Sequence, residues 1–287
     1  MRTEIRPTTT GAADTVDLRH AHMLTVARML SWIVAGVVFA AALASEVARE
    51  LYVDETPWAR EAFRGGDLVT LLVAVPLLVA SLVLVARGSI RAIPVWIGVL
   101  FYTLYMYAYA VFGATFNDAF LLHIAAFSLS MFALACALPA IDLDAVAKEF
   151  VGNRWAKAVG IFMAVVGIGQ GALWVFVVVR NAVSGELIEN IPVSGQHLVF
   201  ALDLSLLVPM LIVSGVLLAR RRPSGFLLGT AMAVMGAITQ LNLNVAAIFQ
   251  ANADVEGAKA LPAEGVFLTL TFVAAALAMV LGGRTRS

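Results

Sequence analysis

The stretch PLLVASLVLVAR at residues 76–87 returns as PMLIVSGVLLAR at residues 209–220. Seven of the twelve positions are identical, and they include a proline, a serine and a closing arginine, which are uncommon in the apolar parts of this chain. A proline inside a helix removes a backbone N–H and usually kinks the helix. The two stretches therefore predict two similar kinked helices, each of which ends in an arginine at a membrane surface.

The whole chain has the composition of a membrane protein. Its 287 residues are 61% hydrophobic and 13% charged, whereas soluble proteins are roughly 45–50% apolar and about 25% charged. The mean hydropathy is +0.92. The apolar residues form non-alternating blocks of about 20, which suits helices across a bilayer and not barrel strands. We predict an all-α polytopic membrane helical bundle that contacts the lipid bilayer. The expected spans are residues 24–45, 68–86, 92–113, 119–140, 156–179, 198–219, 225–248 and 263–282.

The repeated stretch extends into a longer match. The offset of 133 residues, from Pro76 to Pro209, pairs the second span with the sixth and the third with the seventh, and a small shift pairs the fourth with the eighth. The first and fifth spans share only composition. We predict a 4+4 parallel repeat about an axis along the membrane normal. The alternative is that the sequence match arises because apolar helices are built from few residue types. The expected parts are an N-terminal segment 1–23, repeats 24–140 and 156–282, a joint 141–155 and a tail 283–287.

Charge predicts the orientation. With a cytoplasmic N-terminus, 14 of 19 basic residues lie on the cytoplasmic side and 13 of 19 acidic residues on the other. The positive-inside rule then places the protein in the cytoplasmic membrane with both termini cytoplasmic. The acidic outer face has two explanations. It attracts cations, or it only reflects the placement of basic residues on the cytoplasmic side. Ala42-Leu43-Ala44 offers an alternative, cleavage of the first span as a signal peptide, but the repeat gives that span a structural partner.

Polar side chains enter two equivalent spans. The third span holds four of the five tyrosines, and Tyr105 and Tyr109 share a face with Tyr102. The seventh span places Gln240 and Asn244 one turn apart, with Asn242 on another face. Such groups must face protein or water and not lipid. They either bond across helices as packing contacts or line a cavity that opens outward.

Acidic residues and a histidine lie at the same outer level. Asp118 begins the fourth span, His123 lies inside it, and Asp203 lies about 7 Å into the sixth. An unpaired carboxylate there is costly, so we expect a water-filled vestibule around Asp203; the alternative is a helix-start position favoured by the helix dipole. The candidate ligand-binding residues are Tyr105, Tyr109, Asp118, His123, Asp203, Gln240, Asn242 and Asn244.

Several classes of function have no support in the sequence. There is no P-loop, nucleophile elbow or HExxH motif, so we predict no catalytic residue. Asp118 and His123 are five residues apart, too far round a helix for a metal pair, and no metal ligand set is predicted. Basic residues lie at span ends and not in a stripe, which excludes nucleic acid. Neither a cofactor nor an oligomeric state is indicated.

Three quoted stretches carry a resemblance. YAYAVFGATFNDAFLLHIAAFSLSMFAL at 107–134, together with LDLSLLVP at 202–209 and LLARRRPSGFLLG at 217–229, resembles uncharacterised multi-pass integral membrane proteins of actinobacterial type. The resemblance covers roughly half of the chain. It implies a membrane fold and no known activity, and Asp203 within LDL is the residue that matches the pattern.

The favoured function is a small-solute or ion permease, or a related binding protein, with an outward-facing polar pocket between the two repeats. The expected ligand is a small solute or a cation. One alternative is a membrane-embedded enzyme or cofactor carrier that uses His123, Asp118 and Asp203. Another is a structural or assembly subunit without a ligand. The absence of enzyme motifs weighs against catalysis.

Overall fold

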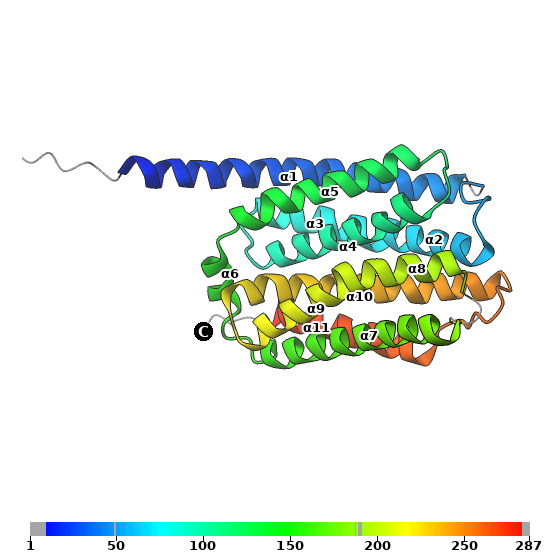
Figure 1. Cartoon of the computed structure of the whole chain (residues 1–287). Helices are drawn as coiled ribbons and strands as arrows, with labels where there is room; N and C mark the ends of the chain where they lie inside the picture. The colour runs from blue at the N-terminus through cyan, green and yellow to red at the C-terminus, as the bar shows by residue number, and fades with distance from the viewer. Residues whose placement is uncertain (1–9, 49, 187, 189–190, 283–287) are drawn as a thin grey trace, which may run out of the picture.

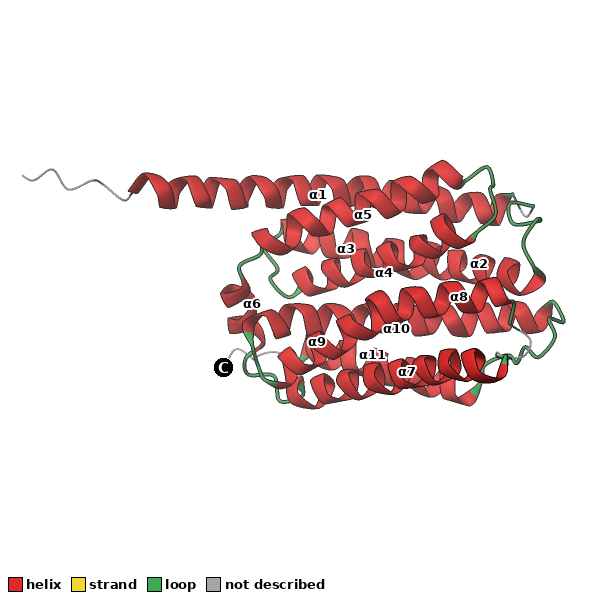
Figure 2. Cartoon of the chain, viewed as in Figure 1, coloured by secondary structure: helices red, strands yellow, loops and turns green. Residues whose placement is uncertain are grey.

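The computed structural model describes residues 10–48, 50–186, 188 and 191–282. Within these residues the chain is a bundle of long helices without strands (Figure 1, Figure 2). Eight continuous helical stretches, two of which are made of two successive helices, are long and apolar enough to cross a membrane. The helices are α1 (Thr10–Val47), α2 (Pro57–Val69), α3 (Val75–Ala86), α4 (Ala92–Gly113), α5 (Phe120–Ala140), α6 (Leu143–Phe150), α7 (Ala156–Ser184), α8 (Val193–Leu202), α9 (Val208–Ala219), α10 (Pro223–Asn252) and α11 (Ala263–Leu281).

The predicted all-α membrane helical bundle is confirmed, and the largest difference from the predicted spans is the start of the second one. The second membrane-crossing helix runs from Pro57 to Ala86 and begins eleven residues before the predicted residue 68. Its first turns carry charges that lowered the hydropathy of this segment. Arg64 pairs with Glu61 at 3.1 Å, and the Thr56 hydroxyl accepts from the backbone N–H of Ala59, so the segment begins as a capped helix.

Two of the membrane-crossing helices are interrupted by a π-helical turn. These turns occupy Thr70–Ala74, between α2 and α3, and Asp203–Leu207, between α8 and α9. Each one lies just before a proline of the repeated stretch, and the wider turn follows from the missing proline N–H. The predicted proline distortion is therefore a π-helical turn in both helices.

The short helix α6 and the loop after it form a clamp at one end of the bundle. The Asp142 carboxylate caps α6. The buried Asn153 side chain donates to the carbonyl oxygens of Ala278 at 2.8 Å and Met279 at 3.2 Å. It also accepts from the backbone N–H of Trp155 at 2.9 Å. The segment predicted as a simple joint therefore fixes the last turn of α11.

Helices α4 and α10 form the centre of the bundle. Their most apolar windows are 67% and 56% buried, more than in any other membrane-crossing helix described. They pack directly against each other, and a Cβ atom added to Gly98 would lie 2.5 Å from the carbonyl oxygen of Ala231. Around this pair, α1 packs on α5 and α7 packs on α9. The predicted domain boundaries stay predictions.

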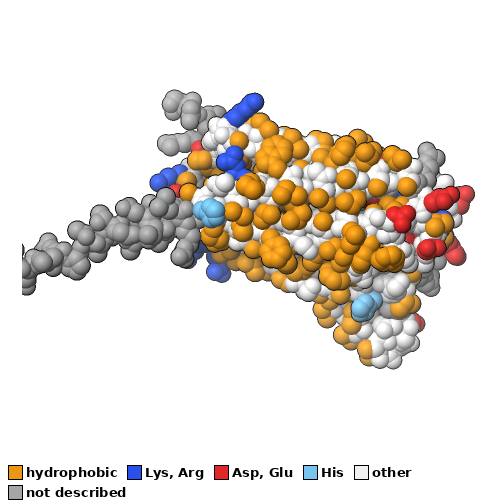
Figure 3. Space-filling model, turned by 90° about the horizontal axis from the view of Figure 1, so that it is seen from above, with side chains coloured by type: hydrophobic (Ala, Val, Ile, Leu, Met, Phe, Trp, Pro, Cys, Tyr) orange, Lys and Arg blue, Asp and Glu red, His pale blue; other side chains and the backbone are white. Residues whose placement is uncertain are grey.

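Charged residues gather at opposite ends of the bundle. Figure 3 shows blue basic side chains at the end where α1 begins, red acidic ones at the other end and a hydrophobic surface between them. We call the end with loops 87–91, 141–155 and 220–222 the basic end. The acidic end contains loops 114–119 and 253–262 and the described residues of the loops before α2 and before α8. The hydrophobic surface suits contact with a bilayer, while the side on which each terminus lies stays a prediction. Several charges used in that prediction, including those in segments 1–9 and 283–287, lie outside the described residues.

Candidate functional site

Asp203 lies deeper in the bundle than the sequence predicted. Helix α8 begins at Val193, so ten residues separate Asp203 from the start of the helix, a rise of about 15 Å. The side chain is buried, with 3% of the residue exposed. This position does not fit the alternative of a helix-start residue at the interface, because that position would lie within the first turn.

The Asp203 carboxylate is held by donors from two other helices. The Tyr105 hydroxyl of α4 donates to Oδ1. From α7, the Gln170 side-chain N–H and the Trp174 indole N–H both donate to Oδ2 at 2.7 Å. The Tyr109 hydroxyl lies 2.8 Å from that of Tyr105, and it donates there because the Tyr105 proton is directed at Asp203. Both carboxylate oxygens therefore act as acceptors in one network.

Small residues bring α7 close enough to supply these donors. A Cβ atom on Gly167 would lie 2.9 Å from Cγ1 of Ile212, and one on Gly171 would lie 2.9 Å from Cγ1 of Val208. Glycines at a helix interface let two backbones approach closely. The stretch GIGQGALW at 167–174 therefore packs on the Asp203 helix and places Gln170 and Trp174, one turn apart, beside the carboxylate.

The network borders a cavity of about 400 Å³. Its walls come from α2, α4, α7, α8 and α10, from the π-helical turn that begins at Asp203 and from the loops before α2 and α8, so both halves of the chain contribute. Five residues of the predicted set line it together: Tyr105, Tyr109, Asp203, Gln240 and Asn242. Glu55, Thr239 and the two α7 residues also line it, and sequence reasoning did not identify them.

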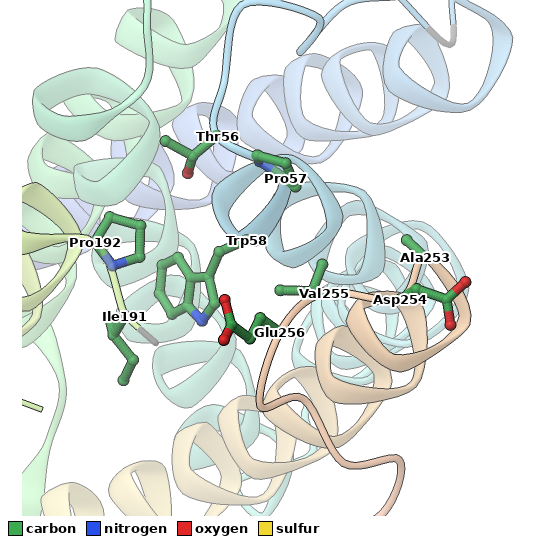
Figure 4. A pocket seen from close by; sticks show the side chains of 9 residues that line it. All are labelled: Thr56, Pro57, Trp58, Ile191, Pro192, Ala253, Asp254, Val255 and Glu256. Atoms are coloured by element: carbon green, nitrogen blue, oxygen red, sulfur yellow. The ribbon is translucent and has the colours of Figure 1, made fainter. Parts of the chain in front are cut away.

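The cavity continues toward the acidic end. A second hollow of about 510 Å³, drawn in Figure 4, shares Thr56, Trp58, Ile191 and Pro192 with it. In Figure 4 the Trp58 indole projects into the middle of the lining residues. Trp58 therefore lies at the junction between the outer hollow and the inner cavity.

The two amides that line the cavity differ in their contacts. Asn242 donates to the Tyr102 hydroxyl at 3.0 Å, and that hydroxyl also lies 3.0 Å from Oγ1 of Thr70. Gln240 makes no side-chain hydrogen bond with another described residue. The Thr239 hydroxyl beside it is buried and also lacks a described partner. Asn242 is thus occupied by packing contacts, whereas Gln240 and Thr239 have unused hydrogen-bonding capacity at the cavity wall.

Three predicted site residues lie elsewhere. Asn244 contacts α11, where it donates to Oγ1 of Thr269 at 2.6 Å. His123 is buried against the rings of Tyr52 and Tyr107, and Asp118 is exposed in the loop before α5. The structure does not bring His123 and Asp118 to the Asp203 cavity, because the fourth span packs on α1 and α4.

A second polar contact at the acidic end was not predicted. The Tyr52 hydroxyl donates to the Asp67 carboxylate at 2.8 Å. Burial raises the pKa of Tyr52, and the neighbouring Asp67 carboxylate raises it further. Tyr52 therefore keeps its proton and acts as the donor that joins the loop before α2 to Asp67 of that helix.

Glu55 is held in a similar way, since its carboxylate accepts from the Thr115 backbone N–H and, at 2.9 Å, from the Thr115 hydroxyl.

Among the described residues no group of three His, Cys, Asp or Glu side chains has the geometry of a metal site. No protein-family model, curated protein or solved structure matches the chain. The cavity is therefore the feature of the molecule that bears on its function.

Proposed function

We propose that this protein binds a small solute in the cavity around Asp203 and acts as a permease or solute-binding protein of the membrane. The observation that carries the proposal is a buried carboxylate on the wall of a cavity of about 400 Å³. Small-molecule sites have volumes of roughly 300–1,000 Å³, mostly apolar walls and a few placed polar groups. The Asp203 network and the unused groups of Gln240 and Thr239 supply those polar groups.

The interrupted helices support movement of the solute. A π-helical turn is a common feature of functional sites, and transporter sites are often formed by discontinuous helices at the interface of two repeats. Asp203 begins one of the two π-helical turns and also lines the cavity. Bending at these turns is the motion that we propose for opening the cavity to the other end.

We also propose that the two halves arose by duplication. Thr70 and Asp203 begin the two π-helical turns at the offset of the repeated stretch. Ser81 and Ser214, at the same offset, each donate to the carbonyl oxygen three residues earlier. The outer helices depart from this pattern, because α1 packs on α5 whereas α7 packs on α9. The proposed repeat therefore concerns the four central spans most directly.

One central contact suggests where the axis lies. Gly98 of α4 meets Ala231 of α10, and these two positions are separated by the repeat offset of 133. Equivalent positions of two related units meet where the axis passes between them. This supports a two-fold relation about a line between α4 and α10, with the Asp203 cavity on one side of it.

The distribution of charge supports an outward opening. The basic end has the excess of arginine and lysine that the positive-inside rule assigns to the cytoplasm, and the outer hollow that shares lining residues with the cavity lies at the other end. We therefore propose that both termini are cytoplasmic. A membrane enzyme that uses His123, Asp118 and Asp203 is less favoured, because these residues do not share the cavity.

Cysteine labelling in intact cells tests this proposal. In a Cys136→Ala background, Gln240→Cys is expected to react with a membrane-impermeant maleimide added from outside, because residue 240 lines the cavity. Asn244→Cys, one turn away on the same helix, is the matched control and is expected to stay unlabelled, since it contacts α11. A solute that binds in the cavity is expected to slow labelling of Gln240→Cys.

The labelling is then repeated with a panel of amines, amino acids, sugars, carboxylates and inorganic ions. Protection by any one class supports the proposed function. Equal labelling of the two cysteines would contradict an outward-open cavity on one face of α10. Labelling without protection by any solute would favour a structural subunit without a ligand.

A further inference from the structure

We infer that the ligand of the Asp203 cavity is an organic cation, whose ammonium group binds at the Asp203 carboxylate and against the surrounding aromatic rings. This inference rests on the proposed function, because it names the class of solute that the same cavity takes. Three properties of the cavity support it: the sign of its charge, its aromatic lining and its small number of free oxygen ligands.

The cavity carries negative charge without a compensating cation. Asp203 and Glu55 line it, and no Lys, Arg or His does so among the described residues. The donors to Asp203 are a phenol, an amide and an indole, all of them neutral. Three donors to both oxygens suit an ionised carboxylate. A positive partner would offset the cost of burying an ionised carboxylate, and a cationic ligand would supply it.

The basic residues of α2 do not provide that partner. The Arg60 guanidinium donates to the carbonyl oxygens of Val53 at 2.7 Å and Glu55 at 3.2 Å. The Arg64 guanidinium donates to the Glu61 carboxylate at 3.1 Å. Neither arginine lines the cavity. Their side chains instead fix the entry to α2 at the acidic end.

Aromatic rings surround the carboxylate. The rings of Trp174 and Phe200 lie 4.8 Å apart, and those of Tyr105 and Tyr109 lie 5.2 Å apart and nearly perpendicular. Trp174 and Tyr105 donate hydrogen bonds to Asp203. The faces of such rings attract cations within about 6 Å, most strongly for tryptophan, and quaternary ammonium groups are bound in this way. The aromatic residues that line the cavity are Trp58, Phe63, Tyr105, Tyr109, Trp174 and Phe200.

The rest of the lining favours an organic ligand over an inorganic ion. A bare metal cation needs several oxygen ligands, whereas the Asp203 oxygens already accept three hydrogen bonds and much of the remaining wall is apolar. Leu198, Val199, Leu207 and Leu243 contribute to this wall. They suit the carbon skeleton of an organic ligand. An anion would meet two carboxylates and no described basic residue.

Binding of matched probes to the full chain, purified into lipid nanodiscs, tests the inference. Choline is compared with 3,3-dimethylbutanol, its neutral isostere with carbon in place of nitrogen, by titration calorimetry and by protection of Gln240→Cys. Choline is expected to bind roughly 30-fold more tightly than the isostere, because cation–π contacts in desolvated sites contribute about 2 kcal/mol. Sodium and potassium ions at equal concentration are expected not to displace choline.

Two variants connect the binding to the carboxylate. Asp203→Asn keeps the size of the side chain and removes its charge, so choline is expected to lose its advantage over the isostere. Asp118→Asn removes an exposed acidic side chain outside the cavity and is expected to keep that advantage. If Asp203→Asn does not fold, the comparison of choline with its isostere in the unaltered chain decides the question.

The outcomes separate the two proposals. Equal binding of choline and its isostere, tighter binding of an anion, or displacement by sodium would overturn the organic-cation inference and leave the proposed function standing. An unchanged choline preference in folded Asp203→Asn would overturn the role of that carboxylate. If no solute of any class protects Gln240→Cys, the proposed function fails and this inference fails with it.

Discussion

Replacing Gly160 with valine is expected to destabilise the bundle by about 3 kcal/mol, the upper part of the range for overpacked cores. A Cβ atom at this position would lie 2.5 Å from the Ala219 backbone nitrogen and 2.6 Å from the Gly215 carbonyl oxygen. Both are backbone atoms, so no side chain can move to make room. Helix α7 would have to shift away from α9, and Gln170 and Trp174 would move with it.

The same helix provides the control. Gly169 has no atom within 4 Å of an added Cβ, so Gly169→Val changes the helix propensity of α7 in the same way without a clash. The stability of the two variants is compared by heating them in detergent and measuring the protein that stays folded by size-exclusion chromatography. A loss of stability in Gly169→Val as large as that in Gly160→Val would contradict close packing of α7 on α9 as the cause.

Replacing Asn153 with leucine is expected to cost about 1–3 kcal/mol and to loosen the end of α11. Leucine has a similar size but cannot donate, so the carbonyl oxygens of Ala278 and Met279 lose their side-chain donor. Removing partners from buried polar groups carries a penalty of that order, and the Ala278 carbonyl oxygen keeps only its bond from the Gly282 backbone N–H. The Trp155 backbone N–H also loses its acceptor.

Two measurements check this prediction. Thermal unfolding gives the change in stability, with Asn252→Leu, at the exposed end of α10, as the control. Labelling of a cysteine at Met279, which is fully buried, is expected to speed up when Asn153→Leu is present. Unchanged labelling together with unchanged stability would mean that the clamp does not hold α11.

Much of the fold could be predicted because membrane-crossing helices follow local hydropathy. The start at Pro57 was missed because Arg60, Glu61 and Arg64 made this part of the helix look like a loop. Their charges are satisfied by neighbours at the end of the bundle, and hydropathy alone does not contain that information. The clamp formed by Asn153 was missed for a similar reason, since its partners lie 125 residues away.

The site was predictable only in part. Asp203 stood out because a lone carboxylate in an apolar span must be accommodated, and Tyr105, Tyr109, Gln240 and Asn242 do lie around the same cavity. Gln170 and Trp174 carried a signal that was not used, because an amide and an indole one turn apart share a helix face. His123 and Asp118 were predicted at the same level as Asp203, but the level of a residue along the bundle does not determine which neighbours its helix faces.

The two π-helical turns begin with different side chains, and under the proposed function this difference predicts how many solute molecules one chain binds. Thr70 is closed in by the Tyr102 hydroxyl, which Asn242 also contacts, and it does not line the cavity. Asp203 does line it. Under the proposed duplication, one half of the chain places a carboxylate at this position and the other a hydroxyl, so a calorimetric titration with a solute that binds the cavity is expected to reach its end point at one molecule per chain.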